Sequence, residues 1–240
     1  MNAFVLAAGF GKRMGSLTKN TPKPLLQIQS ITLLDYSLYL LNLWNIQKIW
    51  VNAHYLSEQI INHFKSFENA QIEVVVEKEK ILGTAGGIRT ALPDNLSSEP
   101  MLIINPDTIF FPDQNFSPKT SLANNSKIHL YLLPSPEGQN YTKISIGKNQ
   151  KLEFGIGNLY YIGLAVINPF CLIELEKNQY FDLSDIFKEC AIRGEITGEI
   201  FSGTVLDLGT KELWDSYQTK DIFGENLNNI KTFLNRSKMT

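Results

Sequence analysis

Two glycines and three cations near the start of the chain have the spacing of a phosphate-binding loop. An apolar strand leads into Gly9 and Gly11, followed by the adjacent cations Lys12 and Arg13 and, further on, by Lys23 between two prolines. Glycine lets backbone N–H groups approach an anion closely, because no side chain blocks the approach. Ammonium and guanidinium groups add full positive charges for phosphate oxygens. The pattern therefore predicts a loop that binds a nucleoside triphosphate.

Two carboxylates follow later apolar strands and have the chemistry of magnesium ligands. Asp107 closes the strand at 101–104, and Asp207 closes a short strand near the end of the chain. Ligands of open parallel sheets bind beyond the carboxyl ends of the strands, so both side chains are expected beside the phosphates. Mg²⁺ takes oxygen ligands and commonly uses one or two carboxylates together with substrate phosphates. The alternatives are an ordinary strand-end turn at Asp107 and a helix cap at Asp207.

The stretch from Gly9 to Leu25 resembles the N-terminal signature of the nucleotidyltransferases that make nucleotide sugars, G-x-G-x-R-x-x-x-L-T-x-x-x-P-K-P-L. One visible departure is Ser16, where members of that family often carry proline. The pattern differs from a P-loop, which needs Gly-Lys-Ser/Thr at the start of a helix, and from the dinucleotide fingerprint, which needs three glycines. An ordinary strand-turn with surface lysines is the alternative.

A second segment, residues 77–87, resembles the E-x-E-x-x-L-G-T-A-G element of the same family, which usually holds the nucleobase and ribose. On its own, a glycine-rich strand-to-helix turn is common, and Thr84 is also suited to cap the following helix. Together the two segments imply a nucleotide site made of Leu6, Ala8, Gly9, Gly11, Lys12, Glu77, Gly83 and Thr84.

The resemblance also implies that Asp107 and Asp207 hold Mg²⁺. Pro106 replaces the glycine that usually precedes the first carboxylate, which removes one backbone N–H from this turn. Residues 205–210 resemble the W-x-D-x-G-T element, with Val205 in place of the aromatic residue.

The short N-acetylmuramate-1-phosphate uridylyltransferases are the members that the chain resembles most, and no hexapeptide array for a β-helix follows. This likeness implies a sugar-phosphate site made of Asn105, Thr142, Glu153 and Gly163. Glycine inside an apolar strand equally marks a bulge, so both interpretations of Gly163 stay open.

The implied reaction is attack of a sugar-1-phosphate oxygen on the α-phosphorus of a nucleoside triphosphate, UTP favoured, with release of pyrophosphate. Arg13 is expected to contact the β and γ phosphates, and Lys23 to bridge the α-phosphate and the sugar phosphate. Open alternatives are a mannose- or heptose-1-phosphate guanylyltransferase, a cytidylyltransferase for a non-sugar phosphate, and a non-catalytic nucleotide-sugar sensor.

Hydrophobic patterning predicts the elements that position these residues, in the three-layer α/β/α Rossmann-like nucleotidyltransferase fold with a mixed, mostly parallel central sheet. Strands are expected at 2–8, 48–53, 72–76, 101–104, 128–133, 142–146, 151–154, 159–167 and 204–206. Helices are expected at 33–43, 57–64 with Ser57 as its cap, 85–92, 169–177, 183–192, 211–219 and 226–234.

Length and composition limit the number of domains, the classes of partner and the cellular compartment. The 240 residues suit a single domain, with 1–110 as the nucleotide half and 111–240 as the sugar-phosphate half and C-terminal helices. A net charge of −2 does not indicate a nucleic-acid partner. Two cysteines without metal spacing indicate packing roles in a reducing compartment. Since no signal peptide or apolar run of membrane length is present, we expect a cytoplasmic monomer or small homo-oligomer.

Overall fold

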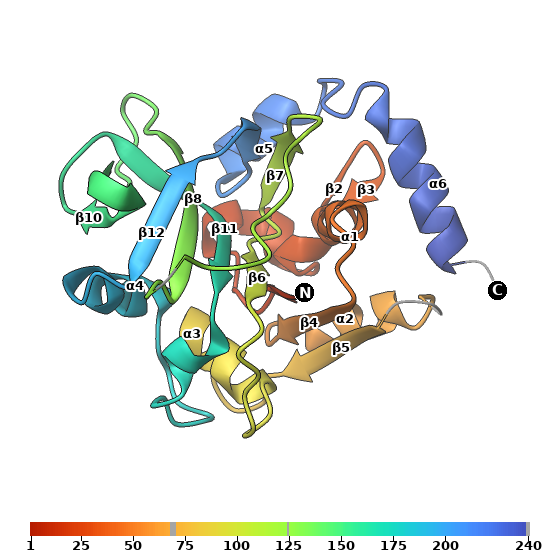
Figure 1. The fold of residues 1–240 in the computed structure, drawn as a ribbon. Helices are drawn as coiled ribbons and strands as arrows, with labels where there is room; N and C mark the ends of the chain where they lie inside the picture. The colour runs from red at the N-terminus through yellow and green to blue at the C-terminus, as the bar shows by residue number, and fades with distance from the viewer. Residues whose placement is uncertain (68–70, 124, 239–240) are drawn as a thin grey trace. The chain divides into compact units, whose positions relative to one another are not determined.

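The strands and helices pack into two compact units, each assembled from separate stretches of the chain (Figure 1). The computed structural model describes residues 1–67, 71–123 and 125–238. Unit 1 comprises 1–2, 82–104 and 111–204, and unit 2 comprises 3–81, 105–110 and 205–240. All residues expected at the phosphate loop and the metal site belong to unit 2.

Parallel strands form the centre of unit 2. β1 (Asn2–Val5), β4 (Lys48–Ala53) and β5 (Gln71–Val76) pair in parallel, with Phe4 opposite Trp50. Phe4 and Val51 are fully buried, as a strand covered on both faces requires. Their carboxyl ends lie at one edge of the ladder, where the chain leaves β1 for the glycine loop.

Helix α1 (Leu33–Leu43) is apolar around most of its circumference and is buried against its neighbours. Thr32 caps it by accepting a hydrogen bond from Asp35 N at 2.9 Å. Its contacts include α6 (Asn226–Lys238), and Figure 1 shows the two helices side by side. The unit also contains α2 (Ser57–Phe64), α5 (Lys211–Tyr217) and the hairpin of β2 (Gln27–Ile28) and β3 (Ile31–Thr32).

Antiparallel pairing dominates unit 1. β11 (Leu159–Ile167) pairs antiparallel with β6 (Met101–Ile104), β8 (Ile128–Pro134) and β9 (Ile144–Ile146), while β8 pairs parallel with β12 (Ile196–Ile200). β10 (Leu152–Phe154) extends the sheet beside β9. Helices α3 (Gly83–Ala91) and α4 (Leu183–Ile192) belong to the same unit. β7 (Thr108–Pro112) and β13 (Gly203–Asp207) pair as a separate two-stranded sheet.

The predicted class of fold, a mixed sheet with helices, is confirmed, and several element bounds need correction. The first strand ends at Val5, so Leu6 to Ala8 belong to the loop. Ser57 starts α2 without capping it, because the N-cap is Leu56 in the left-handed region and no side chain caps this end. The helix expected at 169–177 is only a 3₁₀ turn at Pro169–Leu172.

Among the described residues, no helix is long and apolar enough to cross a membrane.

Candidate nucleotide and metal site

Gly11 shapes the loop that follows β1, because its backbone and its surroundings both exclude a side chain. Its φ is +62°, and a Cβ there would lie 2.8 Å from Cγ2 of Thr18 and 3.1 Å from Cβ of Lys23. The Thr18 hydroxyl also donates to Gly11 O at 3.1 Å. The loop is therefore folded back onto the segment that carries Lys23.

Gly9 has a different environment. Nothing lies within 4 Å of a Cβ added there, and its φ is not in the left-handed region. Gly9, Lys12 and Arg13 are exposed, whereas Ala8 is buried and Leu6 half-buried. Packing therefore does not require glycine at position 9, and the open space beside it is available to a ligand.

Lys23 points at the first carboxylate. The residue begins a short 3₁₀ turn, Lys23–Leu25, after the extended Pro22. Its Nζ donates to Asp107 Oδ2 at 2.5 Å, with the two side chains 10% and 30% exposed. A mostly buried ammonium thus neutralises Asp107, and charge-assisted bonds of this kind are among the stronger ones in proteins.

Pro106 fits the turn that presents Asp107. Thr108 N donates to Asn105 O at 3.3 Å, which closes a four-residue turn with proline in its second position. That position favours proline and needs no N–H donor. The loss of the usual glycine therefore leaves the turn hydrogen bond intact.

The second carboxylate lies on the neighbouring turn. Leu208 N donates to the Asp107 carbonyl at 3.0 Å, and Asp207 Oδ1 accepts from Gly209 N at 2.7 Å. The Arg13 guanidinium packs against the same turn, since a Cβ at Gly209 would lie 3.1 Å from its Nη2. The helix that follows is capped by Thr210, so Asp207 is not its cap.

Unit 2 therefore brings together the two predicted catalytic cations and the two predicted metal ligands. The described residues contain no group of three or more His, Cys, Asp or Glu side chains suited to a metal. A cation here would use carboxylate oxygens and complete its shell with water or phosphate, a donor set that fits Mg²⁺.

Glu77, expected at the nucleotide, has a buried side chain that is 3% exposed. Asn52 Nδ2 donates to Glu77 Oε1 at 2.7 Å, and Asn52 Oδ1 accepts from Ala7 N at 2.7 Å. His54 contacts the Glu77 carbonyl through Nδ1 at 2.5 Å. Neither Asn52 nor His54 was named as a site residue from the sequence, although both lie at the carboxyl end of β4.

In unit 1, the start of α3 is held by the start of α4. Leu183 N donates to the Thr84 hydroxyl at 2.7 Å, while Thr84 N lies 3.4 Å from Asp182 Oδ1. Ala85 N and Gly86 N donate to the Phe181 carbonyl at 2.9 and 3.0 Å. The Thr84 hydroxyl therefore accepts from the first amide of α4, and the chain itself already occupies three of the N–H groups that the start of α3 would offer to an anion.

Of the residues expected near the sugar phosphate, Asn105 lies in the turn before Asp107 in unit 2, and three others lie in unit 1. Gly163, with φ +87°, lies in β11 where its register with β8 shifts between Tyr161 and Ala165, so it occupies a bulge. Glu153 on β10 is exposed, and Thr142 is an exposed loop residue before β9.

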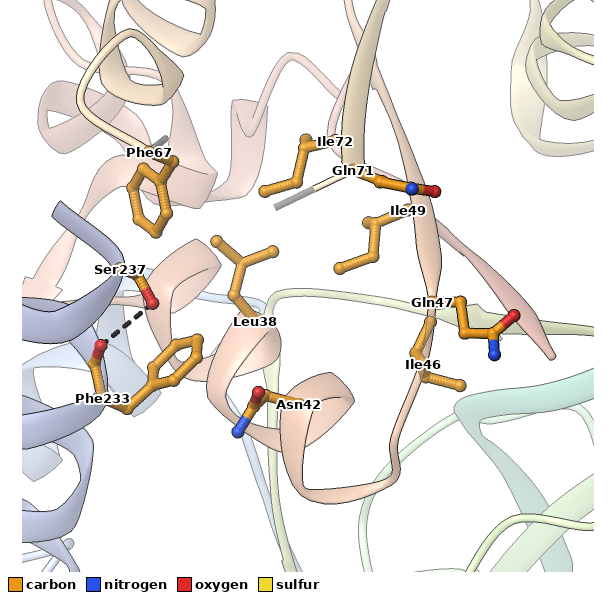
Figure 2. Close-up of a pocket in the computed structure, with 10 residues that line it drawn as sticks. All are labelled: Leu38, Asn42, Ile46, Gln47, Ile49, Phe67, Gln71, Ile72, Phe233 and Ser237. Carbon is orange, nitrogen blue, oxygen red and sulfur yellow. Dashed lines mark hydrogen bonds between the residues drawn. The ribbon is translucent and has the colours of Figure 1, made fainter. Parts of the chain in front are cut away.

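A pocket elsewhere in unit 2 lacks the chemistry of a phosphate site. It has a volume of about 550 Å³ and is lined by apolar side chains such as Leu38, Ile49 and Phe233, together with amides and the Ser237 hydroxyl, which donates to Phe233 O (Figure 2). Among the described residues, no charged side chain and none of the predicted site residues lines it.

Comparisons with known proteins find relatives that are nucleotidyltransferases. A family model described as "MobA-like NTP transferase domain" matches residues 3–129, more than half of the chain. An N-acetylmuramate alpha-1-phosphate uridylyltransferase of Neisseria meningitidis is 29% identical over 88% of this chain and 94% of the relative. A D-glycero-alpha-D-manno-heptose 1-phosphate guanylyltransferase of Aneurinibacillus thermoaerophilus is 28% identical over 64% of this chain and 66% of the relative.

Among solved structures, a Bacillus anthracis protein assigned as a glucose-1-phosphate thymidylyltransferase matches with a TM-score of 0.74. Its identity is 19%, and the match covers 95% of this chain and 99% of the other. At this identity the likeness concerns the fold.

Proposed function

Because the chain belongs to the family of MobA-like NTP transferase domains, we propose that it transfers a nucleotidyl group from a nucleoside triphosphate to a sugar 1-phosphate and releases pyrophosphate. The observation that carries this proposal is the cluster in unit 2, where Lys23 binds Asp107 and Arg13 packs on the turn beside Asp207. We take UTP and N-acetylmuramate 1-phosphate as the favoured substrates, by similarity to the Neisseria relative.

The nucleophile needs no general base, because a sugar 1-phosphate is already an anion. The barrier comes from bringing two polyanions together and from charge at the α-phosphate and the leaving pyrophosphate. Positioned cations lower both costs. Exposed Arg13 is free to contact the β and γ phosphates, and the shape of its guanidinium suits bidentate binding.

Lys23 is the residue we assign to the α-phosphate and the incoming sugar phosphate. The prolines on either side restrict the backbone at Lys23, and its side chain, which is 10% exposed, holds the ammonium against Asp107. Asp107 and Asp207 would hold Mg²⁺, which when bound would neutralise charge at the α-phosphate.

The alternative within the same reaction class is a guanylyltransferase for a heptose 1-phosphate, which similarity to the Aneurinibacillus relative favours. We assign phosphate contacts to the backbone at Gly9 and Gly11, and base and ribose contacts to the segment that contains Gly83 and Thr84. The sugar contacts are assigned to Asn105, Thr142, Glu153 and Gly163. A cytoplasmic location, where triphosphates are abundant, completes the proposal.

Product identification tests this function. Purified protein with Mg²⁺ is incubated with each of the four triphosphates and a panel of sugar 1-phosphates, and nucleotide sugars are detected by mass spectrometry. One dominant nucleotide sugar supports the proposal and fixes both substrates. Detectable triphosphate binding without any nucleotide sugar would instead favour the sensor.

A further inference from the structure

Two side chains at the end of β4 support the nucleotide loop at separate points. Asn52, which is 2% exposed, binds the Ala7 amide at one end of the loop. His54 lies two residues further along and packs against Phe10 at the other end, with ring centroids 5.4 Å apart and an edge-on angle of 88°.

Both side chains also form a hydrogen bond with Glu77. Asn52 donates to the Glu77 carboxylate at 2.7 Å, and the His54 Nδ1–H donates to the Glu77 carbonyl at 2.5 Å. Glu77 is itself fixed to β4, because its N–H donates to the Ala53 carbonyl at 2.8 Å. The loop is thus tied to a rigid strand pair by two short routes.

Burial makes the hydrogen bond between Asn52 and the Ala7 amide costly to break. Ala7 and Asn52 are almost fully buried, so loss of either partner leaves a polar group unsatisfied away from water. The fixed point, Ala7, lies between Leu6 and Ala8 and two residues before the open position at Gly9.

We propose that Asn52 and His54 are positioning residues that hold the 6–11 loop in the shape that binds the triphosphate. Glu77 acts through them, as their common anchor, rather than by direct contact with the nucleotide. This inference rests on the proposed function only in its second step, from loop shape to nucleotide affinity.

Amide exchange measured by NMR tests the first step without any activity. In Asn52→Leu, the Ala7 amide should exchange at least about tenfold faster than in the wild-type protein, while the ladder amide of Val51 keeps its protection. Trp50→Phe is the matched control, since it removes another bond between β4 and β5, from Trp50 Nε1 to Glu73 Oε2 at 3.1 Å, that does not reach the loop. Equal exchange at Ala7 in Asn52→Leu and wild type would overturn the proposal.

Affinity for a fluorescent UTP analogue tests the second step. Asn52→Leu should weaken binding about tenfold. His54→Leu, a milder change, should weaken binding severalfold and serves as the test if Asn52→Leu does not fold. Glu77→Gln keeps an acceptor for Asn52 and should bind severalfold more tightly than Glu77→Leu. Equal losses in the two Glu77 variants, with Ala7 protection retained in Glu77→Gln, would show direct nucleotide contact and overturn the positioning role.

Failure of the proposed function has a separate signature. If no triphosphate binds the wild-type protein while the exchange results stand, the substrate assignment is wrong, and the support of the 6–11 loop by Asn52 and His54 is still correct.

Discussion

The ammonium of Lys23 and the carboxylate of Asp107 form a 2.5 Å ion pair between residues 84 positions apart. The proposed catalytic lysine is thus hydrogen-bonded to a proposed metal ligand. A cation that binds Asp107 must therefore share this carboxylate with Lys23 or displace the ammonium from it.

Removal of this lysine should tighten metal binding. We expect Lys23→Gln to raise the affinity of the nucleotide-free protein for Mn²⁺ about tenfold, because a charge-assisted hydrogen bond of about 1.5–3 kcal/mol no longer competes. Isothermal titration calorimetry measures the affinity of each protein for Mn²⁺. Lys12→Gln removes a charge of the same loop that packs over the Phe10 ring, and it should change the affinity for Mn²⁺ much less. Unchanged or weaker binding in Lys23→Gln would refute the competition.

The same residue should be essential to turnover. Lys23→Ala is expected to lower kcat at least about a hundredfold, since loss of one donor to a transition-state anion costs about 3 kcal/mol. Urea unfolding serves as the check that the variant is folded. A folded Lys23→Ala protein with near-normal turnover would remove Lys23 from the catalytic role.

Alanine should lower the stability of the protein at Gly86 but not at Gly9. A Cβ at Gly86 would lie 2.2 Å from the Gln179 carbonyl, so Gly86→Ala should lower the free energy of unfolding by about 1–3 kcal/mol. Gly9→Ala meets nothing within 4 Å and should keep its stability, while its methyl group enters the space assigned to phosphate and raises KM for the triphosphate. Denaturant unfolding and steady-state kinetics compare them, and similar stability losses in both would contradict the assignment.

Acid should destabilise unit 1 through His129. Burial lowers the pKa of His129 to about 4, with Lys119 also lowering it and Glu199, 3.6 Å away, opposing the shift. Between pH 6.5 and 4 the unfolded chain binds a proton that the folded chain does not, so the free energy of unfolding falls as pH falls.

The expected loss from pH 7.5 to 5 is about 2 kcal/mol. Urea titrations at the two pH values measure it, and the matched variant His129→Gln should lose about that much less than the wild-type protein because it lacks the titrating group. An equal loss in both proteins would assign the acid sensitivity to carboxylates instead.

Local sequence was enough to predict most buried strands and the residue types of the site. The Gly11 turn and the carboxylates at strand ends follow from short segments, whereas the Lys23–Asp107 pair depends on long-range packing. The strand at 2–8 was predicted too long because Leu6 to Ala8 are apolar, yet Ala7 N binds a side chain and not a neighbouring strand.

Tertiary contacts also explain the other errors. The predicted helix does not continue beyond Leu172, because this segment makes its hydrogen bonds to α3 instead. Arg89 Nε donates to the Leu175 carbonyl, and Asn178 N donates to the Thr90 hydroxyl. Thr84 was expected at the nucleotide, with a cap of its own helix as the alternative, and its hydroxyl instead accepts from the first amide of α4, because the chain returns to it 99 residues later. A single sequence carries no signal for such pairings.

Pyrophosphate release tests the central claim most directly. Wild-type protein and Asp107→Asn are compared with Mg²⁺, UTP and N-acetylmuramate 1-phosphate, and with the other triphosphates and sugar 1-phosphates in parallel. We expect sugar-dependent release with one preferred substrate pair and at least about a hundredfold less in Asp107→Asn. No release with any pair, or equal release from a folded Asp107→Asn variant, would contradict a nucleotidyl transfer centred on Lys23 and Asp107.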